Sequence, residues 1–172
     1  MKSIKKIAML VTAGIFSMSA VAQTGSDIVD IAAGSPAHTT LVAAVKAASL
    51  VETLKSAGPF TVFAPTNESF DKLPKGTVET LLKPENKSML AGILTYHVIS
   101  GNLDAAAVVA AIKKGKGKTV LTTVAGGKLT ASIVEGKVIL TDEKGGTSTV
   151  TATDLKGTNG TIHVIDHVLL PK

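Results

Sequence analysis

The sequence predicts a single α+β domain, with helices in the first half and an antiparallel sheet in the second. Apolar residues recur at three- and four-residue spacing between Asp27 and Ala57, which is the period of amphipathic helices. After Tyr96, runs rich in Val, Ile and Thr alternate with glycine pairs, as is typical of β-hairpins. Because the helices precede the strands and do not alternate with them, this class is favoured over a βαβ arrangement. The chain shows no internal repeat and no interdomain linker.

Two breaks divide the first helical stretch. Gly34-Ser35-Pro36 separates a first helix from a second, and Gly58-Pro59 ends a third. Ser49 fits the N-cap of this third helix, and Glu52, three places later, completes the pattern of a capping box. We therefore expect three short helices before the first strand.

A strand and further helices follow. The segment Phe60–Ala64 is β-branched and aromatic and is stopped by Pro65, which predicts a short strand. Pro65 fixes its own φ, so a chain reversal is expected there, with Thr66 or Asn67 capping the next helix and Phe70 packing on the core. Helices are then predicted over Asn67–Lys72, Thr77–Lys83, Asn86–Leu94 and Asp104–Lys114.

The second half is predicted to form strands joined by tight hairpins. Gly126-Gly127, Glu135-Gly136 and Gly145-Gly146 supply the turn residues. The strands are expected at Thr119–Val124, Lys128–Val134, Lys137–Thr141, Ser148–Thr153 and Thr161–Leu169.

The amino-terminal segment, residues 1–22, has the anatomy of a secretory signal peptide. Its apolar run is about 12 residues long, whereas a membrane span needs roughly 20, so no membrane anchor is expected. We expect cleavage after residue 22, a short tail at 23–26 and one domain at 27–172, in a secreted or periplasmic protein. The signal consists of Lys2, Lys5 and Lys6, the apolar run Ile7–Met18 and the cleavage motif Ala20-Val21-Ala22.

Composition excludes several function classes. The formal charge of +5 falls to +2 on cleavage, because three of the 18 cations and none of the 13 acids precede the cut. Every cation is a lysine, and without arginine the bidentate fork that reads guanine is missing, so nucleic-acid binding is not expected. The absence of cysteine excludes disulfides, thiol nucleophiles and thiolate metal sites. With only four Phe and one Tyr in the whole chain, the core should be aliphatic.

Three stretches, in order, resemble the signatures of the fasciclin domain family. The first runs from Thr61 to Phe70 and contains Phe-Ala-Pro-Thr-Asn, the second is the Tyr-His motif in Leu94–Val98, and the third is Asn159–Leu169. The resemblance covers about Asp27 to Pro171. It implies a wedge of two small β-sheets with a flanking cluster of helices, and an extracellular adhesion or matrix-binding role without catalysis.

The resemblance also implies candidate binding residues. In animal members of the family, integrin contacts have been attributed to the Tyr-His region and to an Asp-Ile pair before the closing signature. The matching residues are Tyr96, His97, Asp154 and Leu155, with Leu155 departing from the family's Ile. Because Tyr96 and His97 are adjacent at the start of a predicted strand, we expect at least one ring to be buried and hydrogen-bonded, and the other to face outward.

The closing signature contains two histidines at i, i+4 spacing, His163 and His167. On a helix this spacing suggests a metal site, but on a strand it separates the residues by about 13 Å, too far for a shared ion. His163 is therefore interpreted as a polar support for the closing turn. Asp166 and His167 are expected to point to opposite faces with no nucleophile beside them, which disfavours a catalytic dyad.

Between the last helix and the next strand, Lys113, Lys114, Lys116 and Lys118 alternate with glycines and predict a mobile basic loop. Such a loop is either a solvated, solubilising segment or a site for anionic polysaccharide or lipid head groups.

The leading hypothesis is an exported adhesion module, a monomer without metal or cofactor, whose partner is a cell-surface or matrix protein or a polysaccharide. The alternative is a carrier of a small apolar ligand or lipid, which a pocket of a few hundred Å³ lined by Val, Leu and Ala favours. A hydrolase is disfavoured because no Ser-His-acid arrangement is evident.

Overall fold

Seven strands form one continuous hydrogen-bonded order, β2-β1-β7-β6-β5-β4-β3, in a computed structural model that describes residues 25–172. The fold is mixed α+β, as predicted; the signal peptide, with most of the tail, lies outside the described residues. The strands are β1 (Phe60–Pro65), β2 (Val98–Ser100), β3 (Lys118–Thr122), β4 (Lys128–Val134), β5 (Lys137–Thr141), β6 (Thr147–Gly157) and β7 (Gly160–Ile165).

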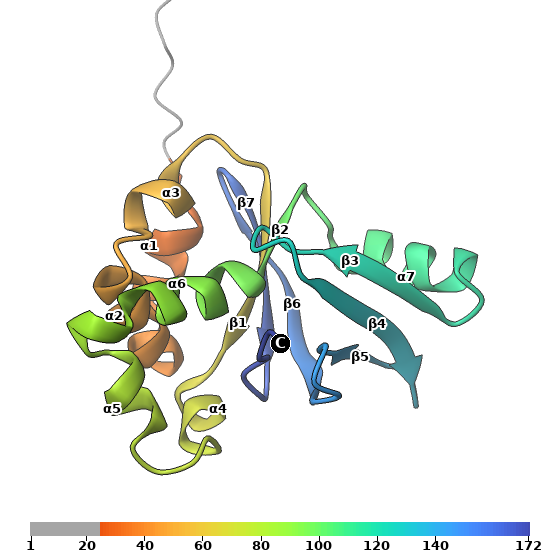
Figure 1. Ribbon diagram of the computed structural model, residues 1–172. Helices are drawn as coiled ribbons and strands as arrows, with labels where there is room; N and C mark the ends of the chain where they lie inside the picture. Colours follow the sequence, from red (N-terminus) through yellow and green to blue (C-terminus); the bar gives the residue numbers. More distant parts are fainter. Residues whose placement is uncertain (1–24) are drawn as a thin grey trace, which may run out of the picture.

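Short helices precede and interrupt the strands, and most of them cluster on one side of the molecule (Figure 1). They are α1 (Ile28–Ala33), α2 (Thr39–Ala47), α3 (Val51–Lys55), α4 (Asn67–Asp71), α5 (Thr77–Leu81), α6 (Lys87–Tyr96) and α7 (Ala105–Lys114), with 3₁₀ turns η1 (Pro36–His38) and η2 (Pro84–Asn86). α7 stands apart from this cluster and packs on β3 and β4.

The long strand β6 joins two parts of the sheet. Its first residues pair with β5, and its remainder pairs antiparallel with β7 across two register shifts. β7 in turn runs parallel to β1, which departs from the all-antiparallel sheet expected from the sequence. The parallel pair is possible because most of the chain separates β1 from β7, whereas β3 to β6 follow one another through the three predicted hairpins.

Two apolar cores lie on opposite faces of the β1–β7 pair. Val62 and Ala64 of β1 pack with the helices α1 to α6, while Phe63 between them packs with Tyr96, α7 and the β3–β5 strands. β1 is thus buried on both faces, which explains why its sequence is almost continuously apolar.

The capping box expected at Ser49 and Glu52 is wrong. Ser49 has φ of 57° and ends α2, because its N–H and that of Leu50 bond back to Lys46 O and Val45 O in a Schellman arrangement. The N-cap of α3 is Leu50, which makes no side-chain capping bond.

The chain reversal after β1 is confirmed, and Thr66 caps α4 in a reciprocal box with Ser69. Asn67 instead reaches the start of α2: its Oδ1 accepts from the backbone N–H of Thr40 at 3.0 Å and its Nδ2 donates to Pro36 O at 2.9 Å. A residue of the first signature therefore fastens α2 to the end of β1.

Candidate functional site

Tyr96 is the last residue of α6, and its ring is fully buried. Its hydroxyl donates to Lys128 O at 2.7 Å and accepts from Glu143 N at 3.2 Å, so it fastens the β3–β4 hairpin to the β5–β6 turn. The ring lies so close to Gly127 that a Cβ there would approach its Cε2 to 2.5 Å. Burial raises the pKa of the phenol, which stays protonated and able to donate.

His97 follows as the C-cap of α6 and is also buried, with 2% of its surface exposed. Its Nδ1 lies 2.8 Å from Ile93 O, and its Nε2 lies 3.0 Å from Leu169 N. Because a carbonyl only accepts and an amide N–H only donates, Nδ1 carries the proton and Nε2 accepts. Burial lowers the pKa of the imidazole from 6.5 to about 4, so the ring is neutral at neutral pH.

The expectation that one ring of the Tyr-His pair faces outward is wrong. The pair ends a helix and does not enter a strand, so the alternation of strand residues does not apply, and both side chains point into the molecule. The structure thus gives both residues internal hydrogen-bond partners and places neither ring on the surface.

Asp154 and Leu155 lie on a bulge in β6, hereafter the β6 bulge (Ala152–Leu155), all of whose residues are exposed. Three steps along β6, from Ala152 to Leu155, are matched by two steps along β7, so one residue is extra. Asp154 takes φ of 61° there, and 39% of the Leu155 surface is exposed.

His163, a buried residue of the neighbouring strand β7, supports this bulge from the interior. It is buried in β7, its ring lies 5.7 Å from that of Phe63, and its Nε2 lies 2.7 Å from Leu103 O. The carbonyl requires a proton on Nε2, so Nδ1 faces the backbone N–H of Asp154 as an acceptor, at a long 3.4 Å. His163 thus links β7 to the β6 bulge and to the segment before α7.

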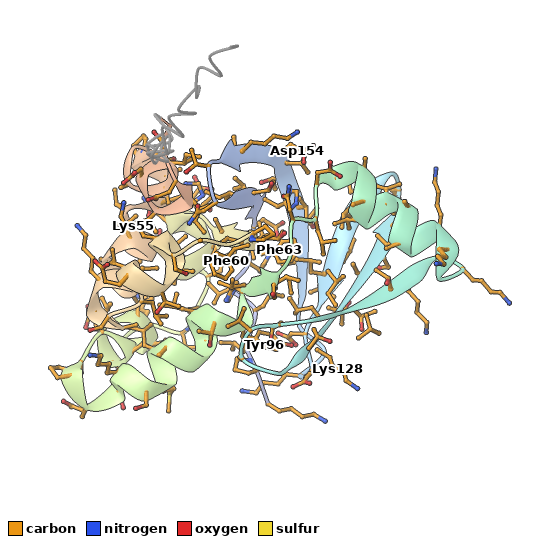
Figure 2. All side chains as sticks on the ribbon, turned by 90° about the horizontal axis from the view of Figure 1, so that it is seen from above. Lys55, Phe60, Phe63, Tyr96, Lys128 and Asp154 are labelled. Carbon is orange, nitrogen blue, oxygen red and sulfur yellow. The ribbon has the colours of Figure 1, made fainter. Side chains whose placement is uncertain are left out.

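The two candidate pairs do not form one site. Asp154 and Tyr96 lie on opposite sides of the molecule as viewed in Figure 2, where Tyr96 is next to Lys128. The family-derived residues therefore divide into an interior pair and a surface pair.

A polar hollow of about 350 Å³ lies next to the β6 bulge. The residue after Leu155, Lys156, is part of its wall, and Asn102 contributes an amide that accepts a 2.6 Å hydrogen bond from the hydroxyl of Thr161. Sequence reasoning missed this hollow, because its walls come from the separate segments 57–59, 102 and 156–161.

The predicted basic loop is a short turn closed by backbone hydrogen bonds, hereafter the basic turn (Lys113–Lys118). Lys113 and Lys114 belong to the last turn of α7, and Lys118 already begins β3. Lys116 ends the helix with φ of 57°, while Gly117 N bonds to Ile112 O at 2.9 Å. A Cβ on Gly115 would fall on Lys118 O, so the glycine is required by close packing. The four lysines are nevertheless exposed, as expected.

Asp166 and His167 do contact each other, contrary to expectation. β7 ends at Ile165, so the pair lies beyond the strand, and Asp166 Oδ1 is 2.8 Å from His167 Nδ1. Ser148 is close by, but its hydroxyl bonds to Asp166 Oδ1 and His167 O, not to the imidazole. Burial raises the pKa of Asp166, but hydrogen bonds from His167, Thr149 N and Ser148 outweigh it and hold that pKa below its usual value.

This trio lacks the geometry of a nucleophile. Ser148 is buried, with 1% of its surface exposed, and its hydroxyl bonds to Asp166 Oδ1 and His167 O, so the imidazole is not placed to take its proton. Within residues 25–172 the structure also contains no group of three or more His, Asp or Glu side chains placed to hold a metal ion.

An apolar cavity of about 200 Å³ opens in the helical part, between α1, α2, α3 and the strands β1 and β7. Its wall includes Val29, Val45, Leu54, Val62 and Ile162.

Across residues 25–172, no helix is long and apolar enough to span a bilayer.

Comparison with known proteins places these features in context. A family model described as "Fasciclin domain" matches residues 36–171. The protein sll1483 of Synechocystis is 50% identical over 155 residues, which cover 88% of this chain and 79% of that protein. The immunogenic protein MPB70 of Mycobacterium bovis is 37% identical over 145 residues, covering 81% of this chain and 66% of its own.

Among solved structures, the FAS1 domain pair of the insect cell adhesion molecule fasciclin I superposes with a TM-score of 0.60 at 23% identity. The match covers 73% of this chain and 42% of the insect chain, and at this identity it shows a shared fold.

Proposed function

The chain belongs to the fasciclin domain family, and from that premise we propose that it is an exported, non-enzymatic binding module that attaches to a cell-surface or matrix component. The observation that carries the proposal is the β6 bulge. It presents an exposed carboxylate, Asp154, beside an exposed aliphatic side chain, Leu155, on a backbone tied to the rigid sheet. A charged group next to an apolar one on a pre-ordered element suits protein recognition, because little ordering entropy is lost on binding.

Two further features of the surface offer contacts to polysaccharides. The polar hollow continues from Leu155 through Lys156 and offers amide and hydroxyl groups of Asn102 and Thr158 to sugar hydroxyls. The basic turn, on another part of the molecule, supplies four exposed cations that attract polyanions.

In this proposal Tyr96 and His97 act from the interior. They hold the hairpins and the end of the chain in place, and the surface residues make the contacts. The amino-terminal segment directs export, so that binding takes place in the periplasm or outside the cell. Insect fasciclin I, which shares this fold, is a cell adhesion molecule, and this agrees with the proposed class of function.

The test is an attachment screen. Beads coated with the purified protein are presented to cells, to neutral and anionic polysaccharides and to matrix proteins, and are compared with beads coated with an unrelated domain of similar size. Attachment above that baseline to at least one surface is expected. Attachment to none of them overturns the proposal for those partner classes.

A further inference from the structure

We propose that the apolar cavity between α1, α2, α3 and the β1–β7 strands is a binding site for a small uncharged apolar molecule. A site of this kind was the alternative that the aliphatic composition suggested. It lies on the helical side of the molecule, where Lys55 is seen in Figure 2, and is distinct from the β6 bulge that presents Asp154. Its test is therefore independent of attachment.

The volume sets the size of the ligand. The cavity measures about 200 Å³, whereas an apolar cavity of about 150 Å³ is enough to stay dry and bind benzene. There is room for a single ring with a small substituent or for a short aliphatic chain. A longer chain fits only if it continues out through the mouth.

The residues that line the cavity determine the polarity of the ligand that it accepts. Side chains of Val, Leu, Ile and Ala dominate it, and His97 is its one buried side chain with polar ring atoms. Both nitrogens of that ring are already bonded, to Ile93 O and Leu169 N, and the ring is neutral. None of the buried side-chain polar atoms in the described wall lacks a hydrogen-bond partner, so an apolar ligand leaves no such atom unsatisfied by entering.

The mouth is polar but nearly balanced in charge. Among the lining residues, Asp30, Lys46 and Lys55 are exposed to solvent. The ammonium group of Lys55 bonds to Asp27 at 2.9 Å and to Asp30 at 2.6 Å, which bridges α3 to α1. These pairs neutralise most of the local charge. Among the exposed lining residues, Lys46 is then the one cation that could bind the carboxylate of an anionic ligand. An uncharged ligand is favoured over its anionic counterpart.

The frame of the cavity is pre-formed. Asn159, in the turn between β6 and β7, accepts from Ile28 N at 3.1 Å and donates to Leu54 O at 2.7 Å. One side chain thus holds the start of α1 and the end of α3 around the cavity, with Lys55 as a second link. A pre-formed apolar site binds without first having to be ordered.

The experiment is a methyl-NMR titration of the purified protein with toluene and with 1-hexanol, using hexanoate as the charged counterpart of the alcohol. Saturable shifts are expected in the methyl groups of Val45, Leu54 and Val62, with at least threefold weaker binding of hexanoate. Shifts that stay linear up to the solubility limit, or that occur elsewhere, overturn the site. Tighter binding of hexanoate overturns the preference for an uncharged ligand.

Two variants fill the cavity from its half-buried rim, Val42→Phe and Ala32→Leu. Each is expected to weaken toluene binding at least tenfold while the spectrum stays that of the folded protein. Val134→Phe is the control, because Val134 is 53% exposed on β4 and remote from the cavity. If a folded filling variant binds toluene as tightly as the control does, the proposal is wrong. If one filling variant does not fold, the other provides the same test.

Discussion

The carboxylate of Asp154 accepts a 2.9 Å hydrogen bond from the backbone N–H of Ala105, the first residue of α7. The contact joins the β6 bulge to the helix that covers the other part of the sheet. Asp154 therefore has two roles, because it fixes the position of α7 and also presents its charge to solvent. Any test of Asp154 in binding has to separate the two.

Replacement of Asp154 by Asn should leave stability unchanged, whereas Ala should cost about 1 to 2 kcal/mol of the free energy of unfolding. Asn keeps an oxygen for Ala105 N and tolerates the φ of 61°, while Ala loses the acceptor and is strained in the left-handed region. Urea denaturation of the two variants measures the difference. Equal stability of the Asn and Ala variants contradicts the proposed link to α7.

Tyr96→Phe should lower the free energy of unfolding by about 1 to 3 kcal/mol, because Lys128 O and Glu143 N lose their shared partner. Attachment per folded molecule should not change, since the hydroxyl is internal. Unfolding and attachment are measured on the same preparation. A loss of attachment at full stability shows instead that Tyr96 contacts the partner.

Acid should destabilise the fold through His97. Burial lowers its folded pKa to about 4, while the unfolded chain keeps the usual 6.5, so the unfolded state binds more protons below pH 6.5. The contribution of neutral His97 to the free energy of unfolding should be at its maximum above pH 6.5. It should fall by on the order of 3 kcal/mol as the pH decreases toward 4. His38, whose pKa burial also lowers, adds to the same slope.

The measurement is urea unfolding between pH 7.5 and 5, above the range where the lowered pKa values of Asp27 and Asp166 act. His97→Gln should be less stable at pH 7.5 but should lose much of the slope. His167→Gln, at an exposed position, should keep it. A His97→Gln slope equal to that of the wild type refutes the assignment.

The basic turn should contribute a salt-dependent component to polyanion binding. Replacing its four lysines with Gln should weaken binding to an anionic polysaccharide and flatten the dependence on salt. The matched control replaces the exposed Lys75, Lys83, Lys87 and Lys144 and removes the same charge. Equal weakening by both sets shows that net charge, and not the turn, attracts the polymer.

Most of the fold was predictable because local signals decided it. The hairpins at Gly126-Gly127, Glu135-Gly136 and Gly145-Gly146 formed as expected, and β4 and β5 have the predicted bounds. Ser49 failed as an N-cap because the same residue ends the preceding helix. The parallel pairing of β1 with β7 is a long-range contact, and no local pattern encodes it.

The candidate site was less predictable, because its residues are positioned by tertiary contacts. Motif resemblance singled out Tyr96 and His97, but their burial depends on Lys128, Glu143 and Leu169, which lie far along the chain. Asp166 and His167 come into contact because β7 ends at Ile165 and not at Leu169, so the two residues lie beyond the strand. Composition did suggest an apolar pocket, though not its place among α1, α2 and α3.

The central claim is that the β6 bulge makes the binding contact. The most direct test measures attachment of the double variant Asp154→Asn, Leu155→Ser to the surface that the wild type binds. Its control is Glu79→Gln, Met89→Ser, which removes one exposed charge and one exposed apolar side chain from α5 and α6. The proposed function predicts at least a tenfold loss of affinity for the bulge variant, with unchanged thermal unfolding, and wild-type affinity for the control. Wild-type attachment by the folded bulge variant contradicts it.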